Sequence, residues 1–323
     1  MGTGRTDEHL LVIKHGALGD IIQGLDAFAS LRAGNPNAHI AVMTSPAFAG
    51  LMASMPWFDE VISDDRGGIT KVASALAIRR QLRRDWSCVI DLQCSRRTAR
   101  YHRFHVKKGT RWIGTAPNCS DPLPDFTGVN NRDRMMHAVR LANGVEASAD
   151  LTWLMPDDIH APDSVSAAAF TPPPGKFVVF ISGCSPHRPE KRWPAAHFAA
   201  VGRRFIDRGY GVVLVGTAAD EGTVNDILHA LPDAVNACGN TNIGQLTWLL
   251  AHADFVLGND TGPIFLAAKA GTKTLVLMGA ATIPDAMRPI QANAQWIHRP
   301  QISAITPDAV LDRIDAMMGT KNA

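Results

Sequence analysis

The chain has 323 residues, of which 46% are hydrophobic and 19% charged, and its formal net charge is +2. At about 150 residues per domain, this length and composition predict two globular domains and exclude a disordered chain, a collagen-like repeat and a disulfide-bonded miniprotein. The apolar runs are shorter than the roughly 20 residues that span a bilayer. Because the first eight residues are polar and the apolar run 10–13 is too short for a signal peptide, we expect a cytoplasmic protein.

Short apolar runs alternate with helical patterns along most of the chain, which predicts βαβ units and parallel sheets. The predicted strands are 10–14, 39–43, 60–62, 88–92, 111–114, 177–181, 211–216, 255–257 and 274–278. The predicted helices begin at 21 and lie at 46–52, 74–84, 195–208, 223–231, 245–251, 262–270 and 307–318. A proline-rich stretch at 155–176 interrupts the alternation. We therefore expect two Rossmann-like domains, residues 1–160 and 161–323.

The five cysteines are odd in number and include no Cys-x-x-Cys pair. We therefore expect reduced thiols, with neither a disulfide framework nor a zinc ribbon. The histidines show no metal-ligand spacing with cysteines or carboxylates, so we expect no metal site.

Charge is distributed unevenly along the chain. Residues 71–111 hold twelve Lys and Arg against two Asp, a local charge of +10. Arg79, Arg80, Arg83 and Arg84 recur at helical spacing and predict one positive stripe. Such a block suits a solvated helix face, an anionic ligand or an anionic membrane surface. We do not expect nucleic acid as a partner, because no recognised binding fold accompanies the block.

Ligands of open α/β sheets bind beyond the carboxyl ends of the strands, and three strand ends here are unusual. They read Lys14-His15-Gly16-Ala17-Leu18-Gly19-Asp20, then Gly183-Cys184-Ser185 leading to Glu190-Lys191-Arg192-Trp193-Pro194, and Gly258-Asn259-Asp260-Thr261-Gly262-Pro263. Together with Asp91-Leu92-Gln93 and the loop 279–289, this ordered set resembles glycosyltransferase family 9, the ADP-heptose:lipopolysaccharide heptosyltransferases. The resemblance extends from about Leu10 to Pro289.

The resemblance implies a GT-B architecture, in which two Rossmann-like domains face a central cleft. It also implies an inverting transferase that moves a heptose, or a similar sugar, from a nucleoside diphosphate such as ADP to lipopolysaccharide core or a related glycan. The acceptor would bind to the N-terminal domain (1–160) and the nucleotide sugar to the C-terminal domain (161–323). Such an enzyme would work at the cytoplasmic face of the inner membrane, with peripheral contact to it.

The resemblance assigns Asp20 as catalytic base and Lys191 to the donor diphosphate. Gly19 and Asp20 sit where a helix begins, and a helix N-terminus favours an ionised carboxylate that can accept a hydroxyl proton. Simple capping of that helix is the alternative role for Asp20. The acceptor carries sugar acids and phosphates, which we expect to meet the polar and basic residues Gln93, Arg96, Arg97 and Arg100.

On the donor side, Thr261 and Gly262 begin a helix whose N–H groups can face phosphate. Asp260 would repel phosphate, so we expect it to bind sugar hydroxyls. Ser185 offers a further hydroxyl, and Glu221 is preferred over Asp220 for the ribose. Because Lys191 and the helix N-terminus can neutralise the diphosphate, we expect no metal and no other cofactor.

One position departs from the family pattern. The family usually has His where this chain has Phe265, so the resemblance does not identify the exact donor sugar. Two alternatives therefore remain: a non-catalytic relative that binds nucleotide sugars or glycans, and a nucleotide-sugar epimerase or hydrolase of the same fold.

Overall fold

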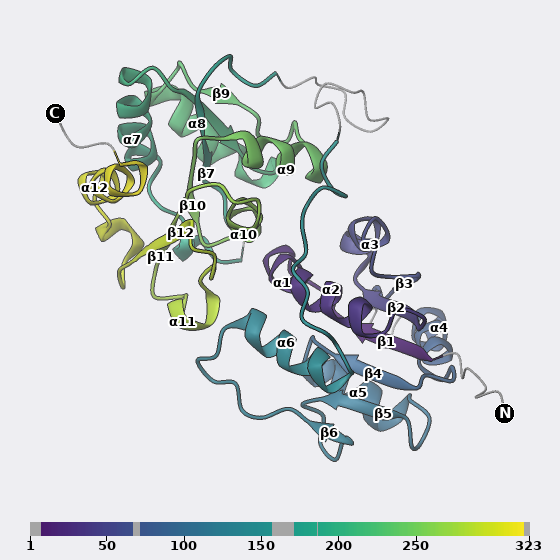
Figure 1. Cartoon of the computed structure of the whole chain (residues 1–323). Helices are drawn as coiled ribbons and strands as arrows, with labels where there is room; N and C mark the ends of the chain where they lie inside the picture. The colour runs from purple at the N-terminus through teal and green to yellow at the C-terminus, as the bar shows by residue number, and fades with distance from the viewer. Residues whose placement is uncertain (1–7, 67–71, 157–170, 186, 320–323) are drawn as a thin grey trace. The chain divides into compact units, whose positions relative to one another are not determined.

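Two parallel β-sheets of six strands each form the framework of the protein (Figure 1). The computed structural model describes residues 8–66, 72–156, 171–185 and 187–319. The chain divides into two units, Met1–Ala149 and Asp150–Ala323, and each unit contains one sheet. The two sheets confirm the predicted α/β class and the two Rossmann-like domains.

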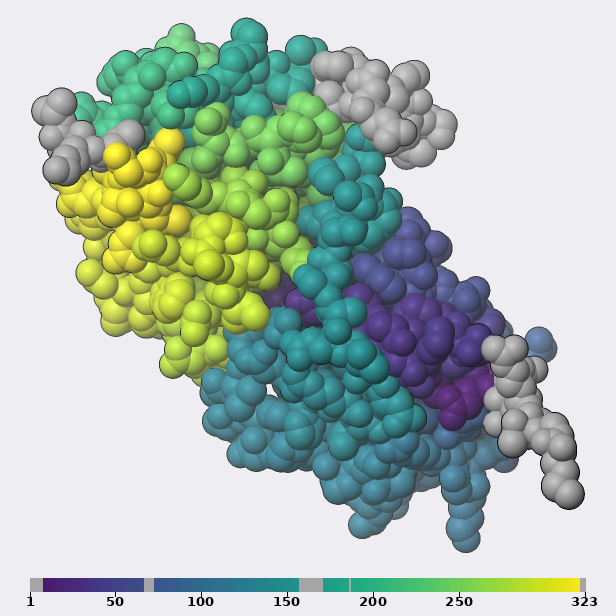
Figure 2. Space-filling model, in the orientation of Figure 1, coloured from purple at the N-terminus to yellow at the C-terminus, as the bar shows by residue number. Residues whose placement is uncertain are grey.

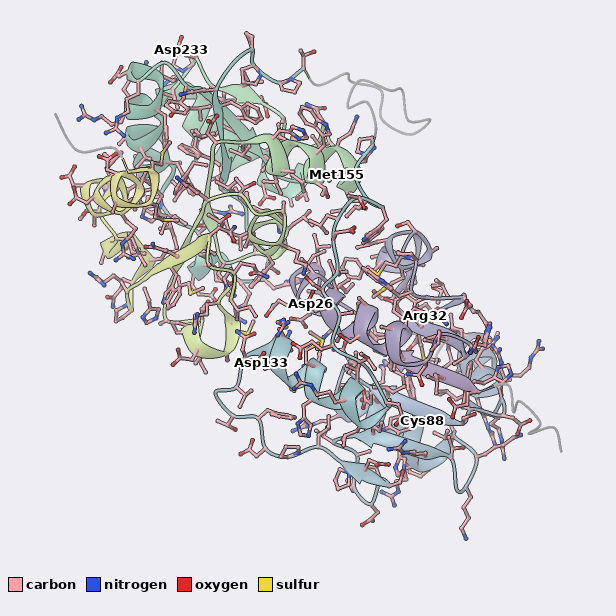
Figure 3. The ribbon with its side chains drawn as sticks, in the orientation of Figure 1. Asp26, Arg32, Cys88, Asp133, Met155 and Asp233 are labelled. Atoms are coloured by element: carbon pink, nitrogen blue, oxygen red, sulfur yellow. The ribbon has the colours of Figure 1, made fainter. Side chains whose placement is uncertain are left out.

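The N-terminal unit contains strands β1 to β6 in the order β3-β2-β1-β4-β5-β6, all parallel. Their bounds are β1 His9–Ile13, β2 His39–Thr44, β3 Glu60–Ser63, β4 Cys88–Asp91, β5 Arg111–Gly114 and β6 Asp121–Pro122. Figure 3 labels Cys88, the first residue of β4. The inner strands are buried on both faces, as expected for a parallel sheet covered by helices on both sides.

In the part of the first unit that the structure describes, the helices around the sheet are α1 Leu18–Gln23, α2 Leu25–Gly34, α3 Pro46–Ala53, α4 Val72–Leu82, α5 Arg96–Phe104 and α6 Asn131–Leu141. Helices α2 and α6 pack against each other on one face (Figure 1). On the other face, Ile78 and Leu82 of α4 and Tyr101 of α5 pack with Leu11 and Ile13 of β1.

The C-terminal unit repeats the same order with strands β12-β11-β10-β7-β8-β9, again all parallel. Their bounds are β7 Phe177–Ile181, β8 Gly211–Val215, β9 Val235–Asn236, β10 Phe255–Asn259, β11 Thr274–Met278 and β12 Ala294–His298. Both sheets therefore reverse strand order at one point, between β1 and β4 in the first unit and between β7 and β10 in the second. Ligands of doubly wound sheets bind at this switch point.

The helices of the second unit are α7 Ala195–Asp207, α8 Glu221–Ala230, α9 Ile243–His252, α10 Gly262–Lys269, α11 Pro284–Met287 and α12 Pro307–Met318. Residues of α7, α8 and α12 share one core with Phe180 and Leu214, and α12 packs against α7. On the surface in Figure 2, the yellow C-terminal residues lie beside the teal-green residues of the same unit. Helices α9 and α10 pack together. Short 3₁₀ turns lie at Pro189–Lys191, Ala218–Asp220 and Ile302–Ala304.

Several boundaries differ from the sequence-based predictions. Helix α1 begins at Leu18 rather than at 21, so Asp20 lies within its first turn. Helix α4 ends at Leu82, so Arg83 and Arg84 lie just beyond it, and Arg84 donates to both carboxylate oxygens of Glu60. The predicted stripe therefore does not include Arg84.

The boundary between the units also differs from the expected one after residue 160. Residues Leu154 and Pro156 lie close to Gly244 of α9, so the segment from Asp150 belongs with the C-terminal unit. Residues 157–170 of the proline-rich stretch, and Lys71 of the basic block, lie outside the described residues. All five cysteines are unpaired thiols, as predicted. Among the described residues, none of the helices combines the length and apolar character that a bilayer span requires.

Candidate functional site

A buried lysine and a partly exposed aspartate meet at the switch point of the N-terminal unit. Lys14 directly follows β1, its side chain is 1% exposed, and its Nζ donates to Asp20 Oδ2 over 3.1 Å. The other carboxylate oxygen of Asp20 accepts from Asn131 Nδ2 of α6, 3.3 Å away. The Asp20 side chain is 30% exposed, so it is held from two sides and remains open to solvent. It makes no cap bond at Ala17, which disfavours the capping interpretation.

The charge of Lys14 depends on Asp20. Burial lowers the pKa of Lys14 below its usual 10.5, and the Asp20 carboxylate works against this by raising the pKa. A buried ammonium without a partner would be costly, because nothing would compensate for the hydration that the charge loses on burial. The pair is therefore a coupled unit, in which each group fixes the position of the other.

Hydrogen bonds from neighbouring strand ends hold the loop that carries Asp20. The His15 N–H donates to Gln93 Oε1 over 2.9 Å, and Ser45 Oγ donates to the His15 carbonyl over 2.7 Å. Gly16 has φ +131°, and a Cβ there would lie 2.4 Å from the Phe48 ring. Only glycine fits this position, so β1 continues into α1 along a fixed path.

The His15 ring is part of a buried network. Its Nε2 lies 2.9 Å from Asp64 Oδ2, which also accepts a hydrogen bond from the Tyr101 hydroxyl. Burial works to raise the pKa of Asp64, but the hydrogen bonds from His15 and Tyr101 outweigh it, and the pKa falls to about 2. At the end of β4, burial raises the pKa of Asp91 to about 6, although the N–H groups of Gln93 and Cys94 donate to it.

The residues predicted to bind the acceptor lie around this switch point. Gln93 already binds the His15 backbone, and Gly19 lies in the first turn of α1. Arg96, Arg97 and Arg100 lie on α5, a helix that sequence analysis did not predict. Its N-terminus is capped by Ser95.

The three arginines differ in their surroundings. Arg96 and Arg100 are exposed. Arg97 donates to the Arg66 carbonyl over 3.0 Å. Arg97 and Arg100 line a hollow of about 360 Å³ with Asp64 and Tyr101. Two of the three predicted arginines therefore share one cavity with the buried network.

At the switch point of the C-terminal unit, a lysine and an aspartate again form a close pair. Lys191 Nζ donates to Asp260 Oδ2 over 2.6 Å, and the side chains are 15% and 3% exposed. Thr282 Oγ1, in the loop after β11, donates to the same oxygen over 2.6 Å. Two donors thus offset the charge of Asp260 and leave the Lys191 ammonium at the surface of the site.

Sequence analysis gave no role to Asn259, yet it joins three segments of this site. Its Nδ2 donates to the carbonyls of Ser182 and Gly183 after β7, and its Oδ1 accepts from the Trp193 N–H over 3.1 Å. Asn259 is fully buried. The only local signal was its position directly before Asp260 in the motif.

Two hydroxyl groups beside this pair are free to bind a ligand. Thr261 precedes α10 as its N-cap residue, and no side-chain bond caps the helix. The Oγ1 of Thr261 and the Oγ of Ser182 are buried and have no hydrogen-bond partner among the described residues. With Gly262 as the first helical residue, this corner offers hydroxyls and N–H groups to an anionic ligand.

The remaining donor candidates lie on the loops after β7 and β8. Asp220 is buried, accepts from Thr217 and pairs with Arg192 at 3.1 Å, so its carboxylate has a structural role. Glu221 is the exposed first residue of α8. Ser185 is exposed. The geometry leaves Glu221, rather than Asp220, available to a ligand.

In the part of the chain that the structure describes, no three His, Cys, Asp or Glu side chains come together as a metal site requires.

Two doubly wound domains in one chain, each with charged residues at its switch point, define the GT-B class of fold. The model of glycosyltransferase family 9 (heptosyltransferase) matches residues 75–308. The chain belongs to this family and is a glycosyltransferase.

Individual relatives agree with this assignment. The chain is 26% identical over 313 residues to lipooligosaccharide heptosyltransferase 2 of Haemophilus influenzae, covering 90% of this chain and 88% of the relative. It is 24% identical over 356 residues to lipopolysaccharide heptosyltransferase 2 of Escherichia coli, covering 96% and 98%. The solved structure of the E. coli heptosyltransferase WaaC with ADP has the same fold, with a TM-score of 0.74, 17% identity, and coverage of 96% and 99%.

Proposed function

We propose that this glycosyltransferase moves a heptose from ADP-heptose, or a closely similar nucleotide sugar, to lipopolysaccharide core, with inversion at the anomeric carbon. The family and the names of the relatives support the sugar and the acceptor. The observation that carries the proposal is the Lys191–Asp260 pair beside the N-terminus of α10, since it presents a cation at the switch point. The structure of the E. coli heptosyltransferase WaaC with ADP supports ADP as the nucleotide of the donor.

In this proposal the C-terminal unit binds the donor. Lys191 contacts the diphosphate, while Thr261 Oγ1 and the N–H groups at the start of α10 bind phosphate oxygens. Asp260 positions Lys191 and binds a sugar hydroxyl. Glu221 accepts hydrogen bonds from the ribose hydroxyls, and Ser185 contributes a further hydroxyl.

The chemistry is a single displacement. The acceptor oxygen forms a bond to the anomeric carbon while the bond from that carbon to the diphosphate oxygen breaks, and the electron pair leaves with the diphosphate. Preorganised donors that face this developing charge lower the barrier most. Lys191 and the helix N-terminus supply these donors, so we propose that the reaction needs no metal ion and no other cofactor.

The N-terminal unit binds the acceptor, and Asp20 takes the proton of the attacking hydroxyl. Lys14 and Asn131 hold the Asp20 carboxylate in one orientation, and its exposed part remains open to the hydroxyl. A positioned base of this kind contributes about 10²–10⁴-fold to a rate. Gly19 allows close approach of the acceptor to the backbone.

The acceptor also carries carboxylates and phosphates. We propose that Gln93, Arg96, Arg97 and Arg100 bind these anionic groups, because all four lie at the end of β4 or on α5. The enzyme would then act in the cytoplasm, in peripheral contact with the inner membrane that holds its acceptor.

A transfer assay tests this function. The protein is incubated with ADP-heptose and lipopolysaccharide core, and mass spectrometry follows the acceptor and released ADP. A gain of one heptose by the acceptor, with one ADP per transfer, supports the proposal. Binding without transfer would favour a non-catalytic relative, while ADP release without acceptor would favour a hydrolase. The family usually has His at the position of Phe265, which is buried in α10 and 5% exposed, so Phe265→His, with folding verified by circular dichroism, tests the sugar preference separately.

A further inference from the structure

Two large apolar side chains are exposed on helices α4 and α5 of the N-terminal unit. Leu76 of α4 and Phe104, the last residue of α5, are each 57% exposed. The two helices cover the same face of the sheet, where Ile78 and Tyr101 join one core. Neither Leu76 nor Phe104 belongs to this core. Transfer of such apolar side chains from water into an apolar environment is favourable, so a partner that covers them would gain binding free energy.

Cations surround these two side chains. Arg79 and Arg83 follow Leu76 by three and seven residues, and both are exposed. The Arg103 guanidinium lies over the Phe104 ring, 4.9 Å from its centre. We call Leu76, Arg79, Arg83, Arg103, Phe104 and Lys108 the α4–α5 face.

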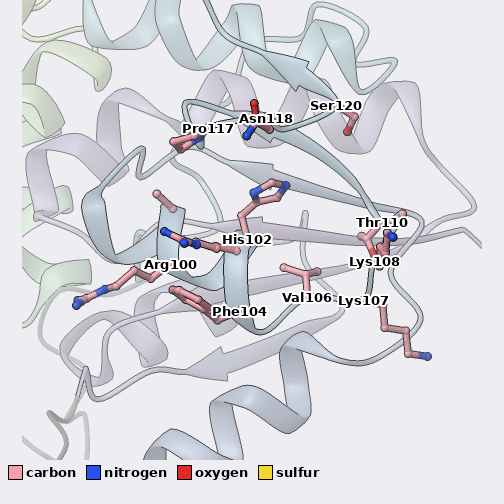
Figure 4. Close-up of a pocket in the computed structure, with 13 residues that line it drawn as sticks. Arg100, His102, Phe104, Val106, Lys107, Lys108, Thr110, Pro117, Asn118 and Ser120 are labelled. Atoms are coloured by element: carbon pink, nitrogen blue, oxygen red, sulfur yellow. The ribbon is translucent and has the colours of Figure 1, made fainter.

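Phe104 lines two hollows. One is the cavity of about 360 Å³ that also contains Arg100, and the other is a hollow of about 1110 Å³, whose lining residues are drawn in Figure 4. Arg103 and Lys108 line the larger hollow. The larger hollow is basic, because its lining among the described residues includes Arg103 and Lys108 and no Asp or Glu, whereas the smaller one also contains Asp64 and Asp65.

Acidic side chains near this face are already engaged. Asp85 pairs with Lys107, and Glu60 pairs with Arg84. By contrast, Arg79, Arg83, Arg103 and Lys108 have no ion-pair partner among residues 8–66, 72–156, 171–185 and 187–319. One further acid, Asp65 in the smaller hollow, accepts a hydrogen bond from Ser74 Oγ. The four cations outnumber this carboxylate, so the face keeps a net positive charge.

Helix electrostatics explain only part of this pattern. Arg79 and Arg103 lie in the last turns of α4 and α5, where cations are favourable. This effect gives no reason for Leu76 and Phe104 to be exposed. Exposed apolar side chains accompanied by cations match the boundary between phospholipid headgroups and acyl chains. An aliphatic side chain such as Leu76 gains nothing from stacking on bases, which disfavours nucleic acid as the partner.

We propose that the α4–α5 face docks on the surface of an anionic phospholipid bilayer. Phe104 and Leu76 enter the boundary between headgroups and acyl chains, while Arg79, Arg83, Arg103 and Lys108 pair with lipid phosphates. This inference rests on the peripheral membrane contact of the proposed function and specifies which surface makes it. The face does not include Asp20 or the residues proposed to bind acceptor and donor.

Co-sedimentation with vesicles tests this docking. The full-length protein binds vesicles of phosphatidylcholine with phosphatidylglycerol, and binds vesicles of phosphatidylcholine alone much more weakly. Each cation near an anionic surface contributes about fivefold to partitioning, so Arg103→Glu with Lys108→Glu lowers binding by at least about 25-fold. Phe104→Ser lowers it by about tenfold, from the lost apolar burial.

Matched controls lie elsewhere on the protein. Val145 is 59% exposed, so Val145→Ser removes a comparable apolar group, and Arg203→Glu with Arg313→Glu makes the same charge change in the C-terminal unit. These controls leave vesicle binding unchanged. All substituted side chains are at the surface, and circular dichroism verifies folding. The proposal is overturned if the controls lose as much vesicle binding as the α4–α5 variants, or if the protein binds both vesicle types equally. Tight binding of tRNA, used as a nucleic-acid probe, without vesicle binding also overturns it.

The proposed function is measured separately. Heptose transfer to a water-soluble core oligosaccharide does not need a bilayer, so the α4–α5 variants retain it. Normal transfer without vesicle binding by the wild type refutes docking alone. Vesicle binding that depends on the face, without any transfer, refutes the proposed function alone.

Discussion

Substitution of Asp20 by Asn separates the structural and chemical roles of the Lys14–Asp20 pair. The substitution keeps the shape of the side chain but removes the charge that faces a lysine with 1% exposure. Removing one partner of a fully buried ion pair costs about 3–5 kcal/mol. Because Asp20 is 30% exposed, water offsets part of this cost, and we expect a loss of about 2 kcal/mol in unfolding free energy.

A double-mutant cycle with Lys14→Met measures the pair itself. The double variant Lys14→Met/Asp20→Asn has no buried charge, so it recovers most of the stability that Asp20→Asn loses. We expect a coupling free energy of about 2 kcal/mol. Hydrogen exchange with mass spectrometry, on peptides from β1 and α1 in urea, reports this unit alone and avoids the two-domain transition.

The pH dependence of the same cycle has a defined sign. The folded-state pKa of Lys14 lies below 10.5, so folding disfavours its protonated form, and stability falls as pH decreases through that pKa. Asp20→Asn removes the carboxylate that raises this pKa, which enlarges the loss at neutral pH. The deficit of Asp20→Asn therefore shrinks as pH rises toward 10.5. Equal stability of wild type and Asp20→Asn at pH 7, or additive effects in the cycle, would show that Lys14 and Asp20 are not coupled.

Further predictions concern the donor site and the buried network. Lys191→Gln lowers kcat/KM for transfer by about 100-fold or more, since it removes a cation from the leaving diphosphate, while Lys176→Gln leaves steady-state rates unchanged. Thr282→Val lowers kcat/KM by about fivefold in the same assay, because Asp260 loses one of its two donors. Chelation with EDTA leaves the rate of transfer unchanged, and restoration of a lost rate by Mg²⁺ would contradict this. The pKa of Asp64 is about 2 against 3.8, so its contribution to stability is present above pH 3.8 and is lost between about pH 4 and 2. His15→Asn removes the His15 hydrogen bond that lowers the pKa of Asp64. In an acid titration followed by circular dichroism, His15→Asn therefore unfolds at a higher pH than the wild type.

The strands were largely predictable from the sequence because a buried parallel strand reads as a continuous apolar run. Phe177–Ile181 is buried at every position, and its predicted bounds are those of β7. Helix α5 was missed because five of its nine residues are Arg or His, and only Thr98 and Tyr101 are buried. Strand β12 was missed because it is only partly buried and has no continuous apolar run.

The motifs identified residues but not their contacts. Lys14 and Asp20 belong to one motif, and their pairing is local. Asn131 is 111 residues away from Asp20, and nothing in its surroundings in the sequence indicates that it donates to this carboxylate. Thr282 reaches Asp260 from the loop after another strand. These contacts depend on tertiary packing, which brings strand ends together in an order that the sequence pattern does not specify.

The central claim is that Asp20 accepts the acceptor proton during inverting heptose transfer. Its most direct test is single-turnover transfer by wild type, Asp20→Asn and the control Asp133→Asn, with ADP-heptose binding measured in parallel. Asp133 is also an acid in a first helical turn, with an exposed side chain (labelled in Figure 3). We predict that Asp20→Asn binds the donor like the wild type but transfers heptose at least about 100-fold more slowly, and that Asp133→Asn behaves as wild type. Transfer by Asp20→Asn at the wild-type rate, or a product that retains the anomeric configuration of the donor, would contradict it.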